Sequence, residues 1–222
     1  LFLAFLFIFS HIFAPILVEA SPIPNVFINE IHYDNDGADK NEFVELAGIE
    51  GLNLSGWSLH FYNGNDGVDY KKYIFADWLF SNTINGFGVA AVNVSGIQNG
   101  SPDGIVLADA QDNVVQFLSY EGSFTASSGI ASGLISTNIE VFESSKTPEN
   151  FSLQLTGKGL EYNDFSWTAP QNSTFGKVNI NQRFMIDKAP VISVNEPNSL
   201  LLLLIAILLL LLGVLKQYRQ SA

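Results

Sequence analysis

The sequence predicts an all-β protein built as an antiparallel β-sandwich, and three observations support this fold class. Short runs in which apolar and polar side chains alternate recur through the middle of the chain. Turn-forming pairs such as Asp36-Gly37 and Asn63-Gly64 separate these runs. No helical periodicity is visible between Ser21 and Asn195. Short strands at this spacing are typical of two packed antiparallel sheets.

Taken in order, the alternating runs predict strands along the whole central region. We expect them at Val26–His32, Glu42–Ala47, Trp57–Tyr62, Lys72–Phe75, Phe87–Val94, Gly104–Leu107, Val114–Tyr120, Phe151–Thr156 and Phe165–Thr168. The Ser- and Gly-rich stretch Gly122–Gly133 predicts a long surface loop. Trp57 follows a Ser-Gly turn signal, and we expect its large ring to fill the core between the sheets.

An apolar segment precedes the strands, and we interpret residues 1–20 as a signal helix. This segment is almost entirely Leu, Phe, Ile and Ala, and Val18-Glu19-Ala20 matches the small-x-small pattern of a cleavage site. Because it lacks an initiating Met, we expect a truncated start. The alternative, a buried core helix, is disfavoured because Pro22 and Pro24 follow directly.

A second apolar segment, residues 200–215, carries no charge and predicts a C-terminal transmembrane helix. At a rise of about 1.5 Å per residue it spans roughly 24 Å, close to the hydrocarbon thickness of a bilayer. Lys216 and Arg219 in the tail 216–222 are typical of a cytoplasmic flank. We therefore expect an exported sandwich at 21–186, a linker at 187–199 and a membrane anchor.

The net charge and the composition exclude several classes of function. The net charge is −12, and it stays at −12 when Glu19, Glu196, Lys216 and Arg219 are left out, so the acidity belongs to the folded domain. An acidic surface repels phosphate backbones, so we expect no direct nucleic-acid binding. The chain has no Cys, which excludes disulfides, Cys-based zinc sites and thiol nucleophiles.

The loop after the first strand is the best metal candidate. It carries Asp34, Asp36, Asp39 and Glu42, with a Gly between the second and third carboxylates. Calcium prefers several carboxylate oxygens from a short loop that a Gly allows to bend. The alternative is a solvated turn whose Asp and Asn side chains bond to their own backbone. The segment Asn63–Asp69 is a weaker second candidate.

Other polar residues leave alternatives open. Glu30 and Glu45 interrupt apolar strands, so they either face solvent or pair with cations and cap backbone donors. After residue 20 the only histidines are His32 and His60. A metal site using His32 and Asp34 is conceivable, but partly exposed histidines at strand ends are common. No Ser stands out as a nucleophile, and we expect no enzymatic activity.

Motifs at both ends of the central region resemble the lamin tail domain. They are Val26–Tyr33, Glu42–Leu46 and Leu52–Leu59 at the start, and Ser152–Gly157, Phe165–Trp167 and Thr174–Asn179 at the end. Where relatives often have Pro before the last Gly, this chain has Phe175. The resemblance covers Asn25–Asn181 and implies an immunoglobulin-like sandwich. Bacterial secreted members are mostly extracellular and have no known activity of their own.

The segment before the tail resembles a second bacterial pattern, the PEP C-terminal sorting signal (PEP-CTERM). Val194–Ser199 contains Glu196-Pro197, followed by an apolar helix and basic residues, although Asn195 replaces the first Pro. The resemblance implies that a sorting enzyme, an exosortase, cuts near the motif and passes the protein to the cell surface. A plain single-span anchor stays open as the alternative.

Together these features predict a non-catalytic module of the cell envelope or extracellular matrix with a structural, adhesive or binding role. Its expected partners are the membrane or the sorting enzyme, and an extracellular polysaccharide or protein. The alternative is an accessory targeting domain for an extracellular nuclease or phosphoesterase. Gly86–Gly88 and Ile97–Gly104 favour it, because they resemble modules beside such enzymes. No cofactor is expected except calcium at the acidic loop.

Overall fold

The computed structural model describes residues 25–80 and 84–185, with the tail positions 207–209, 211, 212, 216 and 219. The chain divides into two units, Leu1–Ile186 and Asp187–Ala222. The predicted signal helix, the linker and most of the predicted membrane helix lie outside the described residues. The described tail positions are helical. Among the residues described, no helix is long and apolar enough to cross a membrane.

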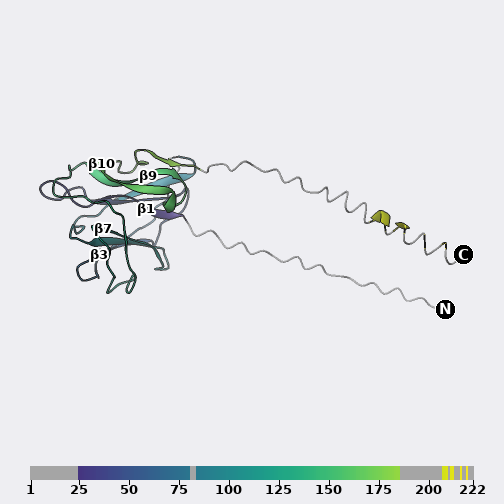
Figure 1. The fold of residues 1–222 in the computed structure, drawn as a ribbon, viewed down its shortest axis with the longest axis horizontal. Coiled ribbons are helices and arrows are strands. Elements are labelled where there is room, and N and C mark those ends of the chain that lie inside the picture. The colour runs from purple at the N-terminus through teal and green to yellow at the C-terminus, as the bar shows by residue number, and fades with distance from the viewer. Residues whose placement is uncertain are drawn as a thin grey trace. The chain divides into compact units, whose positions relative to one another are not determined.

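The described part of the first unit is a β-sandwich, and Figure 1 shows its two sheets as two layers. In the first sheet the strand order is β10-β9-β1-β2-β5, and β11 pairs with β9. Its strands are β1 (Val26–His32), β2 (Phe43–Ile49), β5 (Phe87–Asn93), β9 (Phe151–Gly159), β10 (Phe165–Asn172) and β11 (Gln182–Phe184).

The second sheet has the order β4-β3-β6-β7-β8. Its strands are β3 (Ser58–Asn63), β4 (Val68–Ile74), β6 (Asp103–Ala108), β7 (Val114–Tyr120) and β8 (Thr137–Asn138). Neighbouring strands are antiparallel, except that β8 runs parallel to β7 and β11 runs parallel to β9. The predicted all-β sandwich is therefore confirmed, and each predicted strand is present with ends that differ by a few residues.

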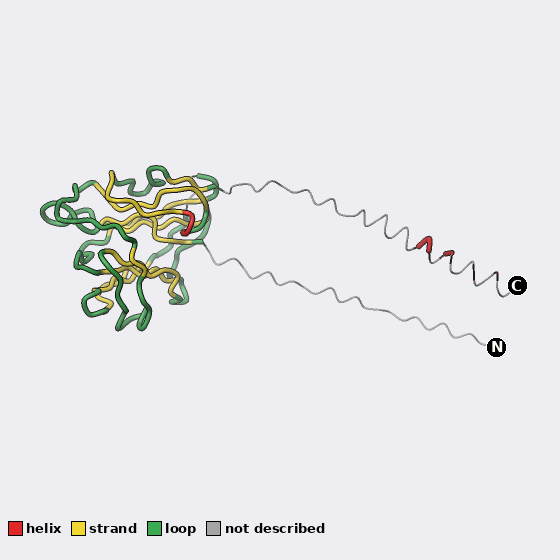
Figure 2. Tube along the Cα trace, in the orientation of Figure 1, coloured by secondary structure: helices red, strands yellow, loops and turns green. Residues whose placement is uncertain are grey.

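Three short elements were not predicted from the sequence pattern. They are β8, β11 and the 3₁₀ turn η1 (Tyr162–Asp164). Figure 2 shows that strands and loops otherwise form the sandwich. Elements of two or three residues are too short to show a periodic pattern, and β8 and β11 each pair with a longer strand that supports them.

The strict alternation expected in the first strand is broken by a β-bulge. The β1–β2 register shifts between Ile28 and Glu30, and the bulge returns Ile31 to the inner face with Val26 and Ile28. These residues pack in the core between the sheets, where Trp57 is 5% exposed. The prediction that Trp57 is a core residue is confirmed.

Chain segments cover the outer face of each sheet. The loop at Gly122–Gly133 buries Phe124, Ala126 and Ala131 against Tyr62 of β3 and Phe117 of β7, so this predicted surface loop also forms a second core.

The C-terminal segment after β10, residues 173–184, lies over the first sheet, where Phe184 stacks on Phe87 at 4.9 Å. This second cover determines the surroundings of the buried acids described next.

Candidate functional site

The four predicted calcium ligands lie in different environments of the β1–β2 loop. Asp36 and Asp39 are exposed, whereas Asp34 and Glu42 are buried. The Glu42 carboxylate accepts the backbone N–H groups of Gly96 at 2.5 Å and of the next residue at 2.7 Å. Glu42 therefore caps the connection between β5 and β6, and its two oxygens are directed at protein donors.

The loop is closed by its own amide side chain. Asn35 donates to the carbonyls of Asp36 and Ala38, each at 3.0 Å, and its Oδ1 accepts the N–H of Lys40 at 2.9 Å. These bonds are those of the alternative interpretation, an Asn-stabilised turn. Within the residues described, no group of three or more His, Asp or Glu side chains is arranged to hold a metal ion. Calcium binding to the loop stays a prediction.

Glu30 and Glu45 form the most unusual feature of the first sheet. They are directly opposite each other on β1 and β2, and both have 0% exposure. Glu30 accepts hydrogen bonds from the backbone N–H of Thr174 at 2.8 Å and from the hydroxyls of Thr174 and Ser152 at 2.7 and 2.5 Å. Of the two alternatives that the sequence left open for these acids, exposure to solvent is wrong: both are buried and cap polar donors, among them backbone N–H groups of the C-terminal segment.

Glu45 completes this buried pair. Its carboxylate accepts the backbone N–H of Gly176 at 2.7 Å and the side-chain amide of Asn29 at 2.9 Å. Burial, together with the nearby Glu30, raises the pKa of Glu45 well above its ordinary value. The two carboxyls hold the turn from Thr174 to Gly176 on both sides of Phe175.

His32 is buried rather than partly exposed, which corrects the expectation for this strand end. Its Nδ1 lies 2.9 Å from a Glu143 oxygen, and its Nε2 lies 3.0 Å from the Lys40 carbonyl. Both neighbours accept hydrogen bonds, so both ring nitrogens carry protons. Burial is the largest single influence and lowers the pKa of His32, but the hydrogen bond and charge of Glu143, the Lys40 carbonyl and the charge of Glu42 together outweigh it, so the pKa of His32 is raised. His32 and Glu143 thus form a buried ion pair, and His32 does not face Asp34.

Ser58, His60 and Asp69 form a row of hydrogen-bonded side chains that no sequence motif predicted. Ser58 Oγ lies 3.1 Å from His60 Nε2, and His60 Nδ1 lies 2.7 Å from Asp69 Oδ2. The order of atoms is that of a serine hydrolase. The Ser58 side chain, however, belongs to a residue that is only 1% exposed, so no substrate carbonyl reaches it in this conformation. The row links β3 to β4 by buried polar contacts.

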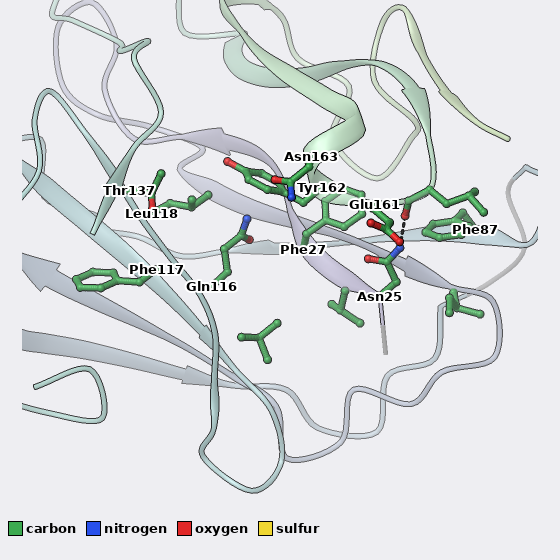
Figure 3. Close-up of a pocket in the computed structure, with 14 residues that line it drawn as sticks. Asn25, Phe27, Phe87, Gln116, Phe117, Leu118, Thr137, Glu161, Tyr162 and Asn163 are labelled. Carbon is green, nitrogen blue, oxygen red and sulfur yellow. Dashed lines mark hydrogen bonds between the residues drawn. The ribbon is translucent and has the colours of Figure 1, made fainter. Parts of the chain in front are cut away.

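One hollow, which we call the edge groove, runs between the first half of β1 and the first half of β7. It has a volume of about 820 Å³, and its walls come from both sheets and from η1. The lining residues are Asn25, Val26, Phe27, Ile49, Phe87, Val115, Gln116, Phe117, Leu118, Thr137, Leu160, Glu161, Tyr162 and Asn163. Figure 3 shows Gln116 and Phe117 toward one side of this hollow and Asn25 and Glu161 toward the other.

Two strand edges meet at the edge groove. On β7, only Leu118 and Ser119 pair with β8, so no described strand pairs with Val114–Phe117 on the side away from β6. On β1, β9 pairs only with Glu30 and Ile31. The Ile28 N–H is satisfied instead by the side-chain oxygen of Gln116 at 2.9 Å. The groove therefore presents main-chain groups beside an apolar wall.

No family model, curated protein or solved structure matches the chain. The resemblance to the lamin tail domain accordingly stays a prediction that rests on the motifs. Sequence reasoning missed the edge groove, because it is formed by six separate segments of the chain. It also missed Glu143, which lies in a loop with no recognisable motif and meets His32 only in the folded domain.

Proposed function

We propose that this protein is a non-catalytic, exported module of the cell envelope or extracellular matrix that binds an extended polypeptide along the edge groove. The apolar segments at 1–20 and 200–215 support the export and the attachment to the membrane. The motifs of the lamin tail type support an immunoglobulin-like arrangement of the sandwich. The resemblance at Val194–Ser199 supports removal of the tail by a sorting enzyme.

The observation that carries the binding proposal is the open edge of β7. A strand edge without a partner exposes backbone N–H and C=O groups that pair readily with another extended chain. Natural edges are usually blocked by charges or Pro, whereas residues 114–117 are Val, Val, Gln and Phe. In strand addition of this kind, main-chain bonds supply affinity and side-chain hollows supply selectivity.

The walls and the charge of the domain indicate the chemistry of the partner segment. One side of the groove presents Phe27, Tyr162 and Ile49, of which Ile49 is 42% exposed. The single charged lining residue is Glu161, and the protein as a whole carries −12. A segment that alternates apolar and basic residues places its apolar side chains on this wall and its cations toward the acidic surface.

The test uses the full-length protein and a blocked hexapeptide, acetyl-Val-Lys-Val-Lys-Val-Lys-amide. We expect measurable binding by calorimetry, and a loss of binding when the peptide bonds are N-methylated, because methylation removes the donors that pair with β7. Ile49→Ala is expected to weaken binding by about fivefold, in line with roughly 1 kcal/mol of lost apolar contact. The control is Ile74→Ala, which changes an exposed residue outside the groove. Equal binding of the N-methylated peptide would contradict the strand-pairing proposal.

A further inference from the structure

A second hollow lies on the outer face of the first sheet and shares no lining residue with the edge groove. This aromatic hollow has a volume of about 560 Å³, within the range of small-ligand sites. Three phenylalanines and three asparagines dominate its lining: Phe43, Phe151, Phe175, Asn41, Asn93 and Asn150. They come from β2, β5, β9, the residue before β9, the acidic loop and the C-terminal segment. Apolar rings and neutral amides thus converge from distant parts of the chain.

Phe175 is the exposed ring of this hollow. It remains 43% exposed and packs edge-on against the buried ring of Phe43, with centroids 5.0 Å apart. Leaving a large apolar side chain partly in water forgoes burial energy. The ring is nevertheless held in place, because Phe43 supports it from below and its backbone belongs to a fixed turn.

The buried acids explain why this turn is fixed. The residue before Phe175, Thr174, donates its N–H to Glu30, and the residue after it, Gly176, donates its N–H to Glu45. Burying two carboxyls is costly for stability. Groups that are costly for stability and that lock the backbone on both sides of an exposed ring are typical of a preorganised binding site.

The polar wall is oriented as well. The Glu149 carboxylate, which also lines the hollow, accepts from the Asn41 amide at 3.2 Å and from the Lys40 ammonium at 3.2 Å. Asn41 itself has a left-handed backbone, with φ of 56°. The hollow therefore offers amide groups and the Glu149 carboxylate beside a ring. Its one basic lining residue among those described, His32, is buried, and its two ring nitrogens already face Glu143 and the Lys40 carbonyl.

We propose that the aromatic hollow binds one or two residues of a neutral polysaccharide. The C–H face of a sugar ring packs on Phe175, whose π-face is electronegative, and the sugar hydroxyls meet the amides of Asn41, Asn93 and Asn150, each of which both donates and accepts. The negative charge of the domain and the Glu149 carboxylate disfavour acidic saccharides. This site is independent of the edge groove, so the protein would join a polysaccharide to a polypeptide.

The test titrates the full-length protein with neutral hexasaccharides, namely β-1,4-glucan, β-1,3-glucan, α-1,4-glucan and β-1,4-mannan, and with hexagalacturonate as the acidic probe. We expect at least one neutral saccharide to bind and the acidic probe to bind more weakly. Phe175→Ala is expected to reduce the affinity by about fivefold or more, and Phe175→Tyr is expected to retain it. The matched control is Phe142→Ala, which removes a ring that is 57% exposed outside the hollow.

Thermal melting of each variant accompanies the titrations. Because Phe175 is partly exposed, we expect its variants to melt close to the wild-type protein, so a loss of binding reports on the ligand contact. Three results would overturn the proposal: no binding of any neutral hexasaccharide at millimolar concentration, unchanged affinity in Phe175→Ala, or tighter binding of hexagalacturonate than of the neutral probes. None of these results bears on peptide binding in the edge groove, which Ile49→Ala tests separately.

Discussion

Replacing Glu30 by alanine tests how strongly the buried acids hold the C-terminal turn. The change removes an acceptor of the Thr174 N–H at 2.8 Å, the Thr174 hydroxyl at 2.7 Å and the Ser152 hydroxyl at 2.5 Å. The Thr174 hydroxyl has a second neighbour, the Asn179 side-chain oxygen at 3.1 Å. The backbone N–H of Thr174, which is partly buried, loses its acceptor.

The magnitude follows from these contacts. A buried donor left unpaired costs about 1–3 kcal/mol, and Glu30→Ala removes the acceptor of both the Thr174 N–H and the buried Ser152 hydroxyl. Removing Glu30 also relieves its repulsion of Glu45, one of the causes of the raised pKa of Glu45, which moderates the loss. We therefore expect Glu30→Ala to lower the free energy of unfolding by about 3 kcal/mol.

The measurement is urea unfolding at neutral pH, followed by tryptophan fluorescence. The matched control is Glu50→Ala, which removes an exposed carboxylate and is expected to change the free energy by less than about 0.5 kcal/mol. A loss below about 1 kcal/mol in Glu30→Ala would refute the reasoning, because it would mean that other contacts hold the turn.

Three further predictions concern stability and metal binding. Burial raises the pKa of Glu45, and the combined effect of Glu143, the Lys40 carbonyl and Glu42 outweighs burial to raise the pKa of His32. The native state therefore binds more protons than the unfolded state, and stability falls as the pH rises through these folded-state pKa values. The melting temperature should be higher near pH 5 than near pH 8. Glu45→Gln should reduce this dependence of the melting temperature on pH. Trp57→Ala should cost roughly 3–5 kcal/mol, and near-wild-type melting would refute its core role. If the acidic loop binds calcium, calorimetry should show a heat of binding at millimolar calcium, and Asp36→Asn should reduce it. The absence of any heat of binding would contradict the calcium site.

Most of the fold could be predicted from the sequence, because alternating side chains and turn pairs record which residues face a core. Phe151–Thr156 shows the pattern plainly, and the structure has a strand there. The pattern misled at the bulge beside Asn29, where one extra residue returns Ile31 to the inner face. A bulge of this kind depends on pairing with a distant strand, which local periodicity does not record.

The sites were less predictable for a related reason. Glu30 and Glu45 have the residue type of solvent-facing positions, and only the C-terminal segment, more than a hundred residues later in the chain, makes them buried. Likewise, the partner of His32 is Glu143, in a loop that no motif marks. The one signal available was the interruption of apolar strands by acids, which left burial with capped donors open as an alternative.

The contacts of Asn179 have a consequence for the order in which the domain becomes structured. Its side-chain amide donates to the carbonyls of Asn29 and Leu155, at 2.9 and 3.0 Å, where β1 and β9 diverge. The first strand to emerge during synthesis therefore completes its bonds only when nearly the last segment of the domain is present. Such long-range closure is slow, and a nascent chain that ends before Asn179 should remain open to proteases, as nested truncations would report. The domain should thus reach the end of its synthesis unfolded, a state compatible with the export proposed above.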